Sequence, residues 1–133
     1  MKTLFEKIAD REIPGKIIWE DTDVIAFLDI SQATKGHTLV VPKKATESVL
    51  TAPAEVVSKV NLVAQRLAKD LVEIFGAEGV NIITNAGETS GQTVPHYHVH
   101  IIPRYAKDEF KFVPQPNEID IEEVYETIIN TIK

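Results

Sequence analysis

The chain contains no cysteine among its 133 residues. A disulfide framework and a thiolate metal ligand are therefore both excluded. No apolar run approaches the roughly 20 residues that a membrane-spanning helix requires. The first residues, Met1 to Lys7, lack the long apolar segment and small-residue cleavage site of a signal peptide. We therefore expect a cytoplasmic protein that has no membrane partner.

Basic residues are also few, with 14 Lys and Arg against 20 Asp and Glu and a net charge of −6. A protein that binds duplex nucleic acid should present a basic face, so we expect no nucleic-acid partner. A small phosphorylated ligand remains compatible with this charge, because a few backbone amides and one or two cations can hold it locally.

Histidine is scarce but concentrated, because three of the 4 histidines are His96, His98 and His100. Their spacing of two is typical of a strand, in which successive side chains point to opposite faces. The three imidazoles should then share one face, and Tyr97, Val99 and Ile101 the other. Three explanations compete at this point: a polar sheet face, a metal site, and catalysis by imidazole as nucleophile or general base.

The remaining hydrophobic pattern predicts an α+β fold, with antiparallel strands and helices packed on one side. A capping box at Thr3 and Glu6 opens a short helix over 3–11, and apolar residues at helical spacing predict a long helix over 53–75. A further helix over 120–132 ends the chain. We expect a single domain, 1–133, with a core of about 3–105 and a C-terminal arm and helix over 106–133. The predicted strands cover 16–20, 24–30, 37–41, 80–84 and 94–103.

The loop before the histidines, 85–93, is longer than a hairpin turn needs and is rich in Gly, Ser, Thr and Asn. Its amides and hydroxyls could surround an anion, and its glycines allow backbone N–H groups to turn towards it. A donor-rich loop that leads into three imidazoles favours a phosphate site beside a nucleophile. A dedicated metal site is less favoured, because no cysteine exists and no acidic residue interrupts the triad.

The segment 96–102, His-Tyr-His-Val-His-Ile-Ile, matches the motif of the histidine triad (HIT) family. Segments 27–31, 36–43 and 91–93 are similar to other blocks of that family, and the likeness runs from about residue 3 to 105. The chain most resembles the Hint-like, bacterial branch. This resemblance implies a HIT-like fold whose five-stranded antiparallel sheet continues across a homodimer.

The resemblance also implies an enzyme that cleaves at the α-phosphate of a purine nucleotide derivative, through a covalent nucleotidyl-histidine intermediate. The substrate would be a nucleoside phosphoramidate or a dinucleoside polyphosphate. His98 would be the nucleophile, His100 would contact the phosphate, His96 would support the ring orientation of its neighbours, and His37 would lie behind the triad. An alternative is a nucleotide-binding regulatory module with little turnover.

The nucleotide-binding residues implied by the resemblance fall into three groups. Asp29 would accept hydrogen bonds from the ribose hydroxyls. Four loop residues would bind the phosphate or the leaving group: Asn85, Gly91, Gln92 and Thr93. Seven apolar residues would line the base pocket: Leu4, Phe5, Ile8, Ile13, Phe27, Leu28 and Ile30. The core face of a helix explains Leu4, Phe5 and Ile8 equally well.

Zinc-carrying relatives look to have a Cys-x-x-Cys pair near the N-terminus and a histidine shortly after a Pro-Lys pair. Here those places hold Thr3, Glu6 and Ala45. We therefore expect no metal and no other cofactor. The C-terminal arm matches no block of the family.

Overall fold

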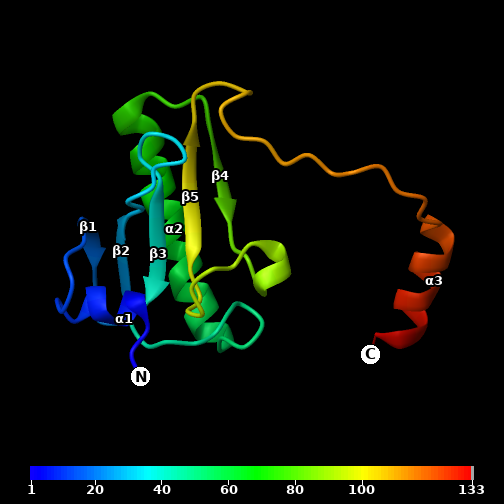
Figure 1. Ribbon diagram of the computed structural model, residues 1–133, viewed down its shortest axis with the longest axis horizontal. Helices are drawn as coiled ribbons and strands as arrows, with labels where there is room; N and C mark the ends of the chain where they lie inside the picture. The colour runs from blue at the N-terminus through cyan, green and yellow to red at the C-terminus, as the bar shows by residue number, and fades with distance from the viewer. Residues whose placement is uncertain (133) are drawn as a thin grey trace.

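Five antiparallel strands form one sheet in the computed structural model, which describes residues 1–132 (Figure 1). The strand order is β1-β2-β3-β5-β4, so β5 lies between β3 and β4. In register, His100 of β5 stands opposite Leu39 on one side and Ile83 on the other. The predicted α+β class with a five-stranded antiparallel sheet is confirmed. The strands are β1 (Ile17–Glu20), β2 (Val24–Leu28), β3 (Thr38–Pro42), β4 (Gly79–Ile83) and β5 (Val99–Arg104).

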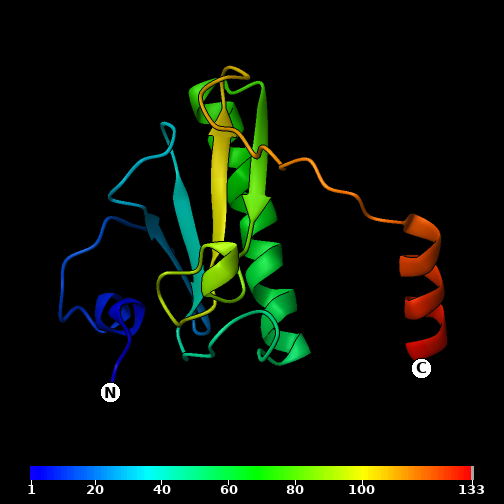
Figure 2. The ribbon, with the colours of Figure 1, turned by 45° about the vertical axis from the view of Figure 1, so that its right-hand side comes forward.

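One face of the sheet is covered by the long helix α2, Ala54–Phe75 (Figure 2). The helix ends where Gly76 adopts a left-handed conformation, φ 65°, which glycine reaches without strain. Alternate residues of the strands turn towards α2, as period-two patterning requires. The resulting core contains, among others, Val24, Ala26, Val40, Tyr97, Val99 and Ile101 from the sheet side, with Val60, Ala64, Leu67 and Leu71 from α2.

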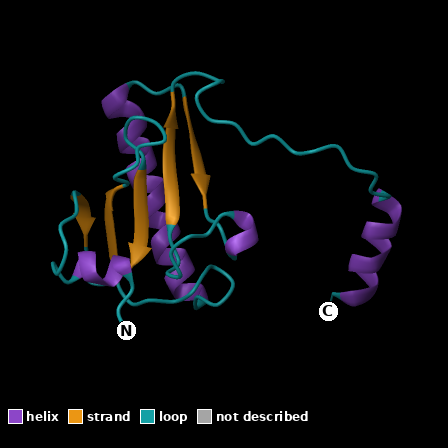
Figure 3. Ribbon diagram, in the orientation of Figure 1, coloured by secondary structure: helices purple, strands orange, loops and turns teal. Residues whose placement is uncertain are grey.

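The short helix α1, Leu4–Ala9, lies on the opposite face, so the expectation of helices on one side holds for α2 and not for α1 (Figure 3). The predicted capping box is present, because Thr3 Oγ1 accepts from the N–H of Glu6 and the Glu6 carboxylate accepts from that of Thr3. The physical reason for the placement is a second apolar cluster. It joins Phe5 and Ile8 to Ile25, Phe27, Leu39 and Val41.

The last strand begins later than the sequence predicts, at Val99 instead of residue 94. Pro95 has no N–H to give to a ladder, and the N–H of His96 turns back to the carbonyl of Val94 at 2.8 Å. The N–H of Tyr97 donates to the carbonyl of Thr46, outside the sheet. His96 and His98 therefore lie in the bent segment that leads into β5, and only His100 belongs to the strand.

Beyond β5 the chain leaves the sheet as an arm and ends in α3, Ile121–Thr131, whose N-cap is Asp120. Residues 111–120 form no helix or strand. Both views show α3 standing apart, beyond the β4 edge of the sheet (Figures 1 and 2). None of the helices within residues 1–132 is sufficiently long and apolar to span a membrane.

Candidate active site

His98 is held so that one ring nitrogen is free to react. Its Nδ1 lies 2.6 Å from the backbone carbonyl of His96. A carbonyl can only accept, so Nδ1 carries the proton and donates it. In the neutral ring the lone pair then lies on Nε2, which makes no hydrogen bond to any of residues 1–132. The ring of Phe5 packs edge-on against that of His98, with centroids 5.0 Å apart.

A second contact fixes the backbone on which His98 stands. The hydroxyl of Thr84, directly after β4, donates to the carbonyl of His98 at 2.7 Å. The carbonyl of His96 therefore accepts from the ring of His98, and the carbonyl of His98 accepts from Thr84. This leaves the imidazole little freedom to turn away from the surface that it faces.

His96 is buried and holds its tautomer through two partners. The carbonyl of Pro42 lies 2.7 Å from Nε2, so Nε2 donates and Nδ1 must accept. The donor to Nδ1 is the hydroxyl of Thr3, at 2.7 Å. The same hydroxyl accepts from the N–H of Glu6 and thus links the start of α1 to the triad.

His37 and His100 form an ordered pair behind His98. The N–H of Ala33 donates to His37 Nδ1 at 3.2 Å, which leaves the proton of the neutral ring on Nε2. That nitrogen lies 2.9 Å from His100 Nδ1 and donates to it. His100 then carries its own proton on Nε2. The rings of His98 and His100 lie with centroids 5.0 Å apart.

Burial keeps all four imidazoles in the neutral state near neutral pH. Removal from water disfavours the charged ring, and this lowers the pKa of His37, His96 and His98 below the ordinary value. The pKa of His100 falls to about 4, first because the ring is buried and then because His98 and His37 lie beside it. A neutral His98 has the free lone pair that a nucleophile requires.

Asp29 stands at the far end of the histidine row. Its Oδ1 accepts from the N–H of Ser31 at 2.8 Å, and its Oδ2 lies 3.6 Å from His37 Nε2. Asp29, His37 and His100 each offer a possible metal ligand atom within 4.8 Å of the others. The tautomers do not suit a metal ion, however, because the Ala33 N–H directed at Nδ1 leaves a proton on His37 Nε2.

The predicted phosphate loop is compact and hydrogen-bonded within itself. It contains the single turn η1, Glu88–Ser90, between Gly87 and Gly91, whose φ values of 92° and 110° suit glycine. The Gln92 carboxamide accepts from the N–H of Gly87 and donates to the carbonyls of Glu47 and Val94. Asn85 is half-buried against Gly91, and Thr93 is exposed.

Most of the predicted base-pocket residues gather on the α1 face of the sheet. Phe5, Ile8, Phe27 and the partly buried Ile13 belong to one cluster. Phe5 connects this cluster to the triad, because its ring contacts those of His96 and His98. Leu28 is half-buried, whereas Leu4 and Ile30 are 48% and 99% exposed and can meet a ligand only at the surface.

Thr3, Glu6 and Ala45 do not form a site that fits a zinc ion. Thr3 Oγ1 is occupied between the N–H of Glu6 and the Nδ1 of His96, and Ala45 offers no ligand atom. Hydroxyl and methyl groups are not among the thiolate, imidazole and carboxylate ligands of zinc. At this place the Thr3 hydroxyl, which caps α1, positions His96 through a hydrogen bond.

Two positioning contacts were not found from the sequence. The local pattern predicts Thr3 as a helix cap but does not indicate its partner His96, which is 93 positions away. Thr84 is predicted only as the end of a strand, and its partner His98 is 14 positions away. No local pattern signals either contact, because both depend on the pairing of distant segments.

An antiparallel sheet with His-x-His-x-His at the start of an inner strand defines a histidine triad protein. The HIT domain profile matches residues 10–107, and the chain belongs to this family, which confirms the resemblance. It is 44% identical to Protein hit of Bacillus subtilis over 106 residues, covering 80% of this chain and 73% of that protein.

Two solved structures illustrate the likeness. A HIT family member from Bacillus subtilis has a TM-score of 0.88 and 37% identity, over 100% of this chain and 99% of that one. A HIT family hydrolase from Clostridium thermocellum has a TM-score of 0.72 and 33% identity, over 85% and 97% of the two chains.

Proposed function

We propose that this protein is a nucleotide hydrolase or nucleotidyl transferase that cleaves at the α-phosphate of a purine nucleotide derivative. The observation that carries the proposal is the tautomer of His98: Nδ1 donates to a backbone carbonyl, and the lone pair lies on Nε2. The similarity to a HIT family hydrolase supports hydrolysis as the reaction class.

The covalent step transfers the nucleotidyl group to His98. As the bond from Nε2 to the α-phosphorus forms, the bond from phosphorus to the leaving group breaks and its electron pair leaves with that group. The imidazole becomes cationic, and the carbonyl of His96 stabilises it by accepting from Nδ1–H. Water then attacks phosphorus and releases one proton to the solvent, the nitrogen–phosphorus bond breaks, and Nε2 regains its lone pair.

The other histidines have supporting roles in this proposal. His100 presents an N–H on Nε2 to the phosphate, because His37 occupies its other ring nitrogen. His96 provides the carbonyl that accepts from His98 Nδ1, and its ring contacts the ring of Phe5 beside His98. Asp29 retains carboxylate lone pairs with which it accepts from ribose hydroxyls. No step requires a metal ion.

The protein acts as a homodimer in this proposal, with the sheet continued through a second copy. β4 is the outermost strand on its side of the sheet. Its Ile82 is 46% exposed. Unpaired edges of this kind are available for pairing with another chain.

The nucleophile is tested by replacing His98 with alanine and offering a panel of nucleoside phosphoramidates and dinucleoside polyphosphates. We expect turnover to fall by about a thousandfold or more while nucleotide affinity changes little. Rapid acid quench and mass spectrometry of the wild type should show one nucleoside monophosphate added at His98. Tyr97→Phe is the matched control, because it removes a hydroxyl that faces Asn61 of α2 and should leave turnover unchanged.

Undiminished hydrolysis by the His98→Ala variant would overturn the mechanism. Nucleotide binding without any adduct or turnover across the panel would instead show the regulatory binding module. Within the panel, the leaving group that is released fastest distinguishes a phosphoramidase from a dinucleoside polyphosphate hydrolase.

A further inference from the structure

One glutamine side chain joins the two ends of the loop between β2 and β3. The carboxamide of Gln32 donates from Nε2 to the backbone carbonyls of Asp29 and His37, at 2.6 and 2.7 Å. Its Oε1 accepts from the backbone N–H groups of Gly36 and His37, at 2.8 and 3.2 Å. Both amide hydrogens and both lone pairs are thus used. The opposite orientation would set the amide oxygen against two carbonyls, so these partners define a single arrangement.

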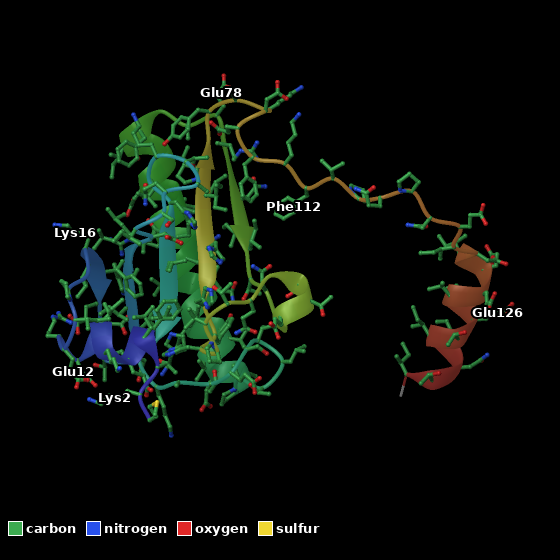
Figure 4. The ribbon with its side chains drawn as sticks, viewed as in Figure 1. Lys2, Glu12, Lys16, Glu78, Phe112 and Glu126 are labelled. Carbon is green, nitrogen blue, oxygen red and sulfur yellow. The ribbon has the colours of Figure 1, made fainter. Side chains whose placement is uncertain are left out.

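The half of the loop that contains Gln32 is not held by packing. Residues 30–33 are all exposed, so burial of apolar surface does not fix them. The other half is anchored, because the buried Thr34 donates its hydroxyl proton to the carbonyl of Pro103. Figure 4 shows the loop at the end of the sheet where Glu78 is labelled, which is also where β5 ends. The Gln32 carboxamide therefore ties the exposed half of the loop to the anchored half.

The group that this tie positions is the N–H of Ala33, the residue directly after Gln32. It donates to His37 Nδ1 at 3.2 Å, which keeps the proton of the neutral ring on Nε2. His37 Nε2 donates in turn to His100 Nδ1, at 2.9 Å, and this leaves the proton of His100 on Nε2. The direction of both hydrogen bonds is therefore set by one backbone N–H in an exposed loop.

This direction decides what His100 presents to a phosphate. Without the N–H of Ala33, the neutral ring of His37 is free to carry its proton on Nδ1, and its Nε2 then accepts. His100 must in that case donate from Nδ1, and its Nε2 presents a lone pair. An N–H stabilises the negative charge of a phosphate oxygen, whereas a lone pair repels it. The contact between Ala33 and His37 therefore selects between a favourable and an unfavourable site.

We propose that Gln32 is a positioning residue of the active site. Its carboxamide holds Ala33 against His37 and thereby keeps an N–H on His100 Nε2 for the α-phosphate. Gln32 touches no reacting atom and acts through the two histidines. The inference rests on the proposed function, in which His100 contacts the phosphate.

The test replaces Gln32 with methionine, which keeps the length of the side chain and makes none of the four hydrogen bonds. Gln65→Met, on the exposed side of α2, is the matched control. The first readout is nitrogen NMR of the full-length protein without substrate. In the wild type and the control we expect His37 and His100 each to show one tautomer, protonated on Nε2. Gln32→Met should show a mixture of both tautomers at each ring.

The second readout separates kcat from KM, with the substrate that the wild type turns over fastest. The Asp29 carboxylate accepts from the N–H of Ser31 and not from Gln32, so the ribose contact should be retained. We expect Gln32→Met to lower kcat by about tenfold or more and to change KM by less than about threefold. Its urea midpoint should match that of the wild type, because an exposed side chain contributes little to global stability.

Three outcomes would overturn the proposal. Single, unchanged tautomers in Gln32→Met would show that the carboxamide merely closes a surface turn. Mixed tautomers with an unchanged kcat would show that turnover does not need a fixed proton on His100. The same changes in Gln65→Met would show that they do not come from the loop.

A second variant and the first readout keep the proposal separate from its premises. If Gln32→Met does not fold, Gln32→Asn takes its place with the same expectations, because its carboxamide is one methylene shorter and cannot reach both ends of the loop. If the wild type forms no adduct and turns over no substrate, the proposed function fails. The NMR comparison, which needs no substrate, then decides by itself whether Gln32 sets the tautomers of His37 and His100.

Discussion

Tyr97, Val99 and Ile101 pack against α2, whereas His98 and His100, one residue away along the same segment, face the side of the sheet that carries α1. The first face consists of apolar side chains of which almost nothing reaches solvent. The second carries, beside the apolar cluster of α1, imidazoles whose ring nitrogens have partners within residues 1–132, apart from Nε2 of His98 and Nε2 of His100. Burial therefore serves stability on one face, and on the other it lowers imidazole pKa values.

The two faces should fail in different ways when a single side chain is shortened. Ile101→Ala leaves a cavity at a site that is 0% exposed, and we expect it to lower the free energy of unfolding by about 2–5 kcal/mol. Turnover per folded molecule should be largely retained, because the side chain faces away from His98. Urea denaturation, with turnover measured below the transition, checks both parts.

Ile101→Val is the graded control, and it should lower the free energy of unfolding by only about 0.5–1.5 kcal/mol. The separation of the two faces is wrong if Ile101→Ala abolishes turnover in fully folded protein. It is also wrong if His98→Ala destabilises the fold as much as Ile101→Ala does.

The fold class, α2 and the capping box could be predicted because each depends on a local pattern, such as Thr3 and Glu6 or the apolar spacing of 53–75. The start of β5 could not, because period two continues through His96 although Pro95 and the contact with Thr46 keep that segment out of the sheet. The candidate site divides in the same way. The triad is visible as a motif, and the partner of His98 Nδ1 is only two residues away. The partners that set the tautomers of His96 and His100 come from distant segments.

The histidine face should titrate, and the α2 face should not. The folded pKa of His100 is about 4, whereas the unfolded chain has the ordinary value of 6.5. As the pH falls from 6.5 to 4, the unfolded state takes up a proton that the folded state does not, so stability present above pH 6.5 is lost. We expect His100 to contribute a loss of about 1–3 kcal/mol after allowance for solvent screening.

The measurement is the free energy of unfolding against pH for the wild type and for His100→Asn. Carboxylates also titrate at low pH, so only the difference between the two curves reports the histidine. That difference should change between pH 6.5 and 4 and be constant above this range. A difference that is flat throughout, or that favours the wild type more strongly as the pH falls, would contradict the assignment.

The smallest effect concerns Thr3, whose hydroxyl couples the cap of α1 to the tautomer of His96. Thr3→Val keeps the shape of the side chain but removes both hydrogen bonds, and we expect it to lower the free energy of unfolding by about 1–2 kcal/mol. Thr3→Ser should restore most of that loss, because serine caps helices and donates as threonine does. The nitrogen NMR shift of His96 Nδ1 separates the two contacts, because a loss of helix capping alone would leave it unchanged. Nδ1 should lose its hydrogen-bonded shift in Thr3→Val and regain it in Thr3→Ser. If Thr3→Val is as stable as the wild type and its His96 signal is unchanged, then α1 does not position the triad. The difference between the two faces of the sheet would then not depend on α1.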